Sequence, residues 1–187
     1  MNRLSLKKAG IWTLIVSLLA LHFLTQNKAY ADEPSSWDYV TSQTGECQID
    51  FPVRPQMMQQ SFQISDDGLR LHYDVYIAPF ENKGVCLLLI AHYPMPILPG
   101  NELAGLEGLL NGLIGHSPDN KLTFAKLIDL NGVSAIDFLI HNKANYFRGL
   151  TFMINSKLYL IAMEGKKEFL NELIFLRFSK SFQHQNP

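Results

Sequence analysis

The stretch "GECQIDFPVRPQ" (residues 45–56) holds the first strand pattern after a long N-terminal segment. Within it, Cys47, Ile49 and Phe51 alternate with polar residues, which is the period of a strand with one buried face. Pro52 ends this strand, because proline has no N–H to donate to a sheet. A compact domain is therefore expected to begin at residue 45, with Cys47 on its buried side.

Residues 1–31 have the pattern of an export signal. A basic start precedes an almost wholly apolar run over 9–25, and the run is followed by Ala29-Tyr30-Ala31, a small-x-small cleavage site. The alternative is an uncleaved membrane anchor, although the run is just short of the ~20 residues that a span needs. We expect cleavage after Ala31, which makes the mature chain periplasmic or secreted and leaves it without a membrane anchor.

Charge and size limit what the exported chain does. The whole chain has 16 Lys and Arg against 17 Asp and Glu, and four of the basic residues lie in the signal, so the mature chain carries 12 against 17, a formal charge of −5. Nucleic acid is not an expected partner, because phosphate binding relies on clustered Lys and Arg. Removing 31 of the 187 residues leaves 156, enough for one core. We expect a polar lead-in over 32–44, with a short helical turn around Trp37, and a single domain over 45–187.

Alternating and apolar runs between turn signals predict more strands. The predicted ranges are 57–64, 69–78, 85–93, 122–130, 133–140, 146–154 and 158–163. Asn131-Gly132 is a strong hairpin signal between two of them. In the strand over 69–78, His72 shares the polar side with Arg70 and Asp74, which indicates a solvated sheet surface.

Two stretches have helical periodicity instead. Leucines recur at three- and four-residue spacing after Asn101, a plausible cap, and a last helix is predicted over 166–182. Gly105, Gly108, Gly112 and Gly115 form a stripe along the first helix, which predicts close packing or a ligand beside it. Because the order is strands, helix, strands, helix with short connections, the expected class is α/β of the α+β kind. It has an antiparallel sheet of about six to eight strands sandwiched by helices.

The order of these segments resembles the PsbP-like family, which is named for an extrinsic protein of photosystem II and shares its fold with a Ran-binding nuclear import factor. The resemblance covers roughly residues 45–182, and its pieces are "GECQIDFPVRP", "LEGLLNGLI", "LNGVSAIDFLI", "INSKLYLIAM" and "FLRFSKSF". It implies an α/β/α sandwich around an antiparallel sheet, and members that act mostly as accessory or binding modules. No site residue is carried over from it.

Cys47 and Cys86 are the only cysteines, and both lie on predicted strands. In an exported domain they either form a disulfide, worth ~4 kcal/mol for so long a loop, or remain two buried thiols. Neither cysteine lies in a CxxC pair or before a helix, so neither is expected to act as a catalytic thiol.

The other reactive residue types form no recognisable motif. The five histidines after the signal have no metal-ligand spacing, and no cofactor is predicted; they are His72, His92, His116, His141 and His184. Asp129 and Asp137 are the carboxylates most worth inspecting as a pair. A hairpin that places Asp137 opposite Arg148 predicts a structural ion pair instead.

The proline-rich stretch "YPMPILP" (93–99) is the predicted partner-contact segment, through Met95, Ile97 and Leu98. Its alternative is a crossover whose side chains complete the core. The function that follows is an exported, non-enzymatic PsbP-like domain that binds another envelope protein. The alternatives are a small exported hydrolase whose carboxylates meet only in the fold, and a carrier of a small apolar ligand beside the glycine stripe.

Overall fold

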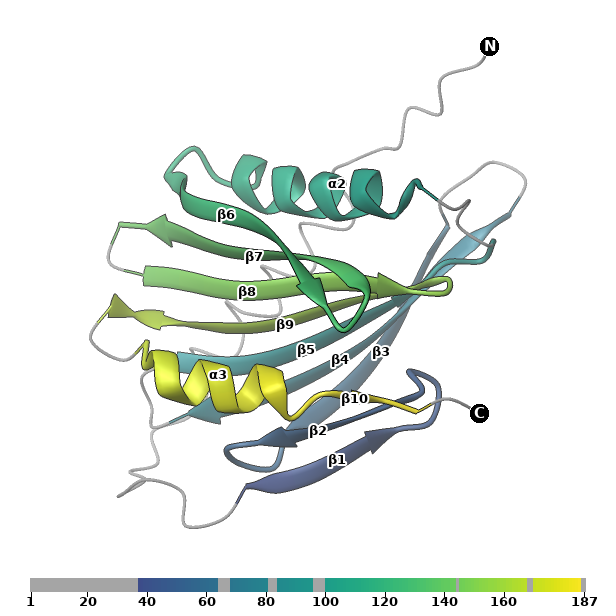
Figure 1. Cartoon of the computed structure of the whole chain (residues 1–187), viewed down its shortest axis with the longest axis horizontal. Helices are drawn as coiled ribbons and strands as arrows, with labels where there is room; N and C mark the ends of the chain where they lie inside the picture. The colour runs from purple at the N-terminus through teal and green to yellow at the C-terminus, as the bar shows by residue number, and fades with distance from the viewer. Residues whose placement is uncertain are drawn as a thin grey trace.

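The computed structural model describes residues 37–63, 68–80, 84–95, 100–143, 145–167 and 170–185, so the expected signal over 1–31 lies outside the described residues. A seven-stranded antiparallel sheet, in the order β3-β4-β5-β9-β8-β7-β6, dominates the fold (Figure 1). Its strands are β3 (Gln56–Gln63), β4 (Arg70–Phe80), β5 (Gly84–His92), β6 (Asn120–Leu130), β7 (Val133–Asn142), β8 (Asn145–Ile154) and β9 (Lys157–Lys166).

A second, three-stranded sheet has the order β1-β2-β10 and contains β1 (Asp38–Ser42), β2 (Cys47–Phe51) and β10 (Gln183–His184). Residues 38–42 of the lead-in therefore form a strand, and the helical turn predicted around Trp37 is wrong. The reason is pairing: β1 lies antiparallel to β2 over its whole length, from Asp38 opposite Phe51 to Ser42 opposite Cys47, which satisfies its backbone groups in a ladder.

Helices α2 (Glu102–Gly115) and α3 (Glu172–Lys180) cover opposite faces of the large sheet (Figure 1). One core lies under α2 and includes Leu106, Leu110 and Leu113, as the leucine spacing predicted. The other lies between the sheet, α3 and the small sheet, and includes Phe175 and Phe178. The antiparallel α+β class is confirmed. Within the described residues, no helix is long and apolar enough to cross a membrane.

The last helix is shorter than predicted. Strand β9 continues to Lys166 because it pairs along its whole length with β8 and nearly as far with β5. Helix α3 begins only at Glu172, where the side chain of Asn171 accepts a hydrogen bond from the backbone N–H of Leu173 at 2.9 Å. On this helix Leu173 is 76% exposed, while Phe175 and Phe178 are buried.

The hairpin between β7 and β8 is centred one residue further along the chain than the predicted register requires. Asn142 pairs with Asn145, so the turn contains two residues, and Lys143 adopts a positive φ of 51° there. Asp137 consequently lies opposite Leu150, and Arg148 lies opposite Leu139. The direct opposition of Asp137 and Arg148 that the sequence suggested is wrong.

Candidate functional site

An open groove of about 570 Å³ lies where the turn between β1 and β2 meets strands β3, β4 and β5. It is lined by Thr44, Gln59, Gln60, Ser61, His72, Tyr73, Asp74 and His92. The groove brings His92 of β5 to His72 and Asp74, which lie two residues apart on β4. It is the candidate functional site of the described residues.

Asp74 is the centre of the groove and is only 4% exposed. Its Oδ2 accepts a hydrogen bond from Thr44 Oγ1 at 2.5 Å and lies 2.9 Å from His92 Nε2, while its Oδ1 accepts one from Gln59 Nε2 at 2.9 Å. Strands β4 and β5 bring His92 close because His92 lies directly opposite His72, which places Asp74 on the diagonal. The prediction that Asp74 belongs to a solvated surface is therefore wrong, although His72 is exposed.

The contacts of Asp74 decide its charge. Burial raises the pKa of this carboxyl, but hydrogen bonds from His92, Thr44 and Gln59, with the charge of His92, outweigh burial and lower the pKa below its ordinary value. An ionised carboxylate only accepts hydrogen bonds, so the Nε2 of His92 carries the hydrogen that lies between them. The His92 side chain remains 20% exposed and faces the groove.

The turn over the groove is fixed in place. The phenol of Tyr159 donates to the carbonyl of Gly45 at 2.8 Å, and the backbone N–H of Gln185 donates to the carbonyl of Glu46 at 2.7 Å. The carboxylate of Glu46 pairs with Lys157 at 2.7 Å, and this hydrogen bond holds the pKa of Glu46 below its ordinary value. A side chain at Gly45 would collide with Ile90. The groove is thus preformed by the fold.

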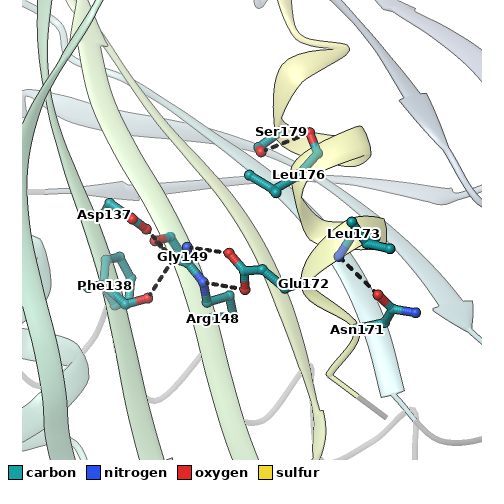
Figure 2. Close-up of polar contacts among 9 residues, drawn as sticks. All are labelled: Asp137, Phe138, Arg148, Gly149, Asn171, Glu172, Leu173, Leu176 and Ser179. Carbon is teal, nitrogen blue, oxygen red and sulfur yellow. Dashed lines mark hydrogen bonds and ion pairs between the residues drawn. The ribbon is translucent and has the colours of Figure 1, made fainter.

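A second polar cluster lies under α3, at Arg148 of β8 (Figure 2). Arg148 is 7% exposed, and its guanidinium pairs with Asp137 of β7 and donates to Glu172 of α3 at 3.0 and 3.2 Å. It also donates to the carbonyl of Phe138 at 3.2 Å and stacks over the ring of Phe175, 4.2 Å from the ring centroid.

Arg148 and Asp137 meet diagonally, because a side chain as long as arginine reaches across one pair of the ladder. Burial lowers the pKa of Arg148, but its hydrogen bonds to Glu172 and Asp137 outweigh burial and raise that pKa above its ordinary value. Since the cluster ties α3 to the sheet and every partner is part of the fold, its role is structural.

Asp129 and Asp137 do not form a site. Asp129 lies opposite Ser134, and its Oδ1 accepts a hydrogen bond from the backbone N–H of Gly132 at 2.9 Å. Asp137 of β7 lies opposite Lys126, which is three residues from Asp129 on β6. Because neighbouring residues of a strand face opposite sides, the two carboxylates lie on opposite faces of the sheet. Among the described residues, no group of three or more His, Cys, Asp and Glu side chains is placed to hold a metal ion.

Cys47 and Cys86 are free, buried thiols, which is the second of the two alternatives that the sequence left open. Cys47 belongs to the small sheet and Cys86 to β5 of the large sheet, and both fill space in the α3-side core. Burial raises the pKa of the Cys47 thiol to about 12 and raises that of Cys86 as well. Both therefore remain protonated and act as small apolar residues.

Of the predicted partner-contact residues, Met95 is 59% exposed, while Ile97 and Leu98 lie outside the described residues. Tyr93, two residues before Met95, is anchored: its backbone N–H donates to the carbonyl of Ser156 at 2.9 Å, and its ring packs on the α2-side core. The segment thus leaves the core at Tyr93 and presents Met95 to solvent.

The glycine stripe of α2 has a packing reason at one position. A Cβ on Gly105 would lie 3.1 Å from the sulfur of Met153, whereas a Cβ on Gly108 or Gly115 would have nothing within 4 Å. Helix α2 packs over β6, β7 and β8, while the groove lies at β3, β4 and β5. The hypothesis of a carrier for a small apolar ligand expects an apolar cavity beside these glycines. The groove lies elsewhere and is therefore not that cavity.

Comparisons with known proteins address the fold. No protein-family model matches the sequence, and no curated protein is similar to it. The architecture is that of a PsbP-like domain, as the resemblance predicted. The solution structure of cyanobacterial PsbP (CyanoP) from Synechocystis sp. PCC 6803 resembles this chain with a TM-score of 0.55 and 13% identity, over 86% of this chain and 98% of that chain.

Proposed function

We propose that this chain is an exported, non-enzymatic PsbP-like domain that binds another protein of the cell envelope. The observation that supports this most is the PsbP-like fold in which both faces of the large sheet are occupied by packed cores. The signal pattern over residues 1–31 supports export.

The hydroxyl groups of the groove favour binding over hydrolysis. A nucleophilic hydroxyl needs a base that accepts its proton. Ser61 Oγ accepts a hydrogen bond from Arg70 Nε at 2.6 Å, and Thr44 Oγ1 donates a hydrogen bond to Asp74, whose lowered pKa makes its carboxylate a weak base. Neither hydroxyl donates to the nearby His92, which itself bonds to Asp74. The groove therefore presents fixed donors and acceptors rather than an activated oxygen.

The proposed contact with the partner is at Met95. An exposed apolar side chain on a segment that is anchored at Tyr93 and stiffened by prolines loses little entropy on binding. Methionine also adapts to irregular apolar pockets.

A photo-crosslinking amino acid at Met95 tests this function in intact host cells, with the same amino acid at Leu173 as a matched control. Leu173 is 76% exposed on α3, so a general stickiness of exposed apolar sites would appear there too. We expect one defined adduct at Met95 and none at Leu173. Adducts at neither position, or the same adducts at both, contradict the proposal. Mass spectrometry of the mature N-terminus checks export, with Asp32 as the expected first residue.

The Asp74–His92 pair is the observation that favours a hydrolase as second candidate. The matched test compares hydrolysis of ester, peptide and glycoside substrates by the natural protein and by His92→Gln. Turnover by the natural protein that disappears in His92→Gln while the fold is retained would establish the hydrolase and overturn the binding domain.

A further inference from the structure

The α2-side face of the large sheet is wider than the helix that covers it. Helix α2 packs over β6, β7 and β8, yet apolar side chains on the same face of β4, β5 and β9 are also buried. Six of them, each at most 6% exposed, are Val75, Ile77, Val85, Leu87, Leu160 and Ala162. Neighbouring strands are about 4.8 Å apart, so β4 lies about 14 Å from β8, whereas a helix is about 10 Å wide. This part of the face therefore has another cover.

Glu164 of β9 indicates that the cover is apolar. It follows Leu160 and Ala162 in the alternation of the strand, so it faces the same side, and its neighbours in the ladder are Val85 and Phe147. Its Oε2 is buried without a hydrogen-bond partner among the described residues, and burial raises the pKa of Glu164 to about 7. The cover thus keeps water from this carboxyl group without compensating it, as an apolar segment does.

The described residues do not supply this cover. Outside the sheet, the apolar residues described in this core belong to α2 and to Tyr93. The internal segments outside the described residues are at most four residues long. The apolar one, 96–99, leads from the Tyr93 end of the sheet to α2, whose Gly105 lies beside Met153 at that same end. Val85 lies eight residues from Tyr93, about 27 Å along the sheet, and is out of its range.

Residues 9–25 have the composition and the length of the cover. This run is almost wholly apolar and contains no Lys, Arg, Asp or Glu. As a helix, its 17 residues would be about 25 Å long and about 10 Å wide. The face to be covered spans about 10 Å from β4 to β9 and about 20 Å from Val85 to Ala91. The 12 residues over 26–37 extend up to about 40 Å, enough to pass around the sheet from β1 on the α3 side.

We propose that, in the chain that still carries its signal, the apolar run 9–25 lies on the α2-side face of β4, β5 and β9. The run then buries its own apolar surface on the folded domain. Cleavage after Ala31 removes this cover and leaves an apolar face on the exported domain. The proposal concerns the chain before cleavage and does not depend on the partner contact at Met95.

Photo-crosslinking in the full-length chain tests the proposal. The chain is made by cell-free synthesis without membranes, in detergent-free buffer, with a photo-crosslinking amino acid at Leu18 in the middle of the run. We expect an intramolecular adduct with β4, β5 or β9, located by mass spectrometry. The matched control has the same amino acid at Leu173, which is 76% exposed on α3 and is expected to form no adduct with these faces. If Leu18 forms adducts only elsewhere in the chain, only with a second copy, or not at all, the proposal is overturned.

A charged residue in the run gives a second measurement, which does not depend on the crosslinker. Leu18→Asp places a carboxylate against the apolar face and is expected to release the run, so that the fluorescence of the apolar dye ANS increases several-fold. Gln26→Asp adds the same charge outside the run and is expected to leave the fluorescence unchanged. Equal fluorescence in the two variants overturns the proposal.

The carboxyl group of Glu164 reports the cover directly. In the full-length chain, Glu164→Gln is expected to stabilise the protein more at pH 8 than at pH 4, because the buried carboxyl group resists ionisation. In the processed chain that starts at Asp32, this dependence on pH is expected to disappear, because Glu164 then meets water. The same dependence in both chains would mean that another part of the protein covers Glu164, and would overturn the proposal.

Discussion

Asp74 and Arg148 are both charged side chains buried on the α3-side of the large sheet, at 4% and 7% exposure, yet they are used in opposite ways. Arg148 is closed in by strands β7 and β8, by α3 and by the ring of Phe175. Asp74 lies at the open groove, and its partner His92 still reaches solvent. Equal burial therefore serves to fix a helix in one place and to hold the polar lining of an open groove in the other.

Glu164 of β9 shows how burial changes the pKa of a carboxyl group when hydrogen-bond donors to its buried oxygen are missing among the described residues. Its Oε2 is buried without a hydrogen-bond partner among the described residues, and burial raises the pKa of Glu164 to about 7. The pKa of Asp74 moves the other way, because hydrogen bonds to its charged form outweigh burial.

Arg148→Met is expected to lower the free energy of unfolding by about 3 kcal/mol, the low end for breaking a buried ion pair. The low end applies because the side chains of Asp137 and Glu172 are 23% and 58% exposed and regain water. Urea denaturation measures the change. The control is Arg177→Met, since the exposed Arg177 only stacks on Trp37 and its loss is expected to cost little. Equal losses in both variants would contradict a special role for Arg148.

Glu164→Gln is expected to stabilise the protein at pH 8 by about 2 to 3 kcal/mol, at ~1.36 kcal/mol per pKa unit. The folded state holds the proton of Glu164 more tightly than the unfolded state does. The stability that this proton contributes to the natural protein is complete below the unfolded pKa near ~4.3 and is lost as pH rises through about 7. The difference between the two proteins should therefore vanish toward pH 4. A constant difference between pH 4 and pH 8 would refute this assignment.

Asp74→Asn is expected to lower the free energy of unfolding at pH 7 by about 1 to 3 kcal/mol, because an amide cannot accept from all three donors. The folded pKa of Asp74 is lowered, so its contribution is present above the unfolded pKa near ~3.9 and is lost as pH falls through the folded value. Thermal unfolding from pH 7 to pH 3 should show the two proteins converging only at the acidic end. Convergence already at pH 6 would mean that folding raises the pKa of Asp74 instead of lowering it.

Glu46→Gln is expected to cost less than about 1 kcal/mol, since exposed ion pairs contribute little. Glu46 is 39% exposed, and its partner Lys157 is 16% exposed. The remaining cost should decrease further in 1 M salt, where such pairs are screened. A loss of unfolding free energy as large as that of Asp74→Asn would show that the Glu46–Lys157 pair stabilises the fold as much as the contacts of Asp74 do.

Most of the fold could be predicted from the sequence because apolar runs and turn residues mark each strand. Strand β5 was predicted over 85–93 and lies at 84–92, and α2 begins after Asn101 as expected. The boundary between β9 and α3 was missed because residues 166–171 fit a helical period, whereas pairing on both sides of β9 extends the strand. The spacing of apolar residues within one segment gives no information about its pairing with strands elsewhere in the sequence.

The site was harder to predict. A hairpin turn over 80–84 places His72 opposite His92, so the nearness of Asp74 to His92 could have been found from the spacing alone. Thr44 could not, since it reaches Asp74 only through the packing of the small sheet on the large one. Asp137 and Arg148 were expected to lie directly opposite each other, and the structure brings them together diagonally.

The small sheet places β2 between a strand from the beginning of the domain and one from its end, with Cys47 paired to both Ser42 and His184. A chain that leaves a ribosome or a translocation channel N-terminus first cannot complete this sheet until its final residues are free. Truncation before Gln183 would remove β10 and leave Cys47 and Gln48 of β2 without a paired strand on that edge.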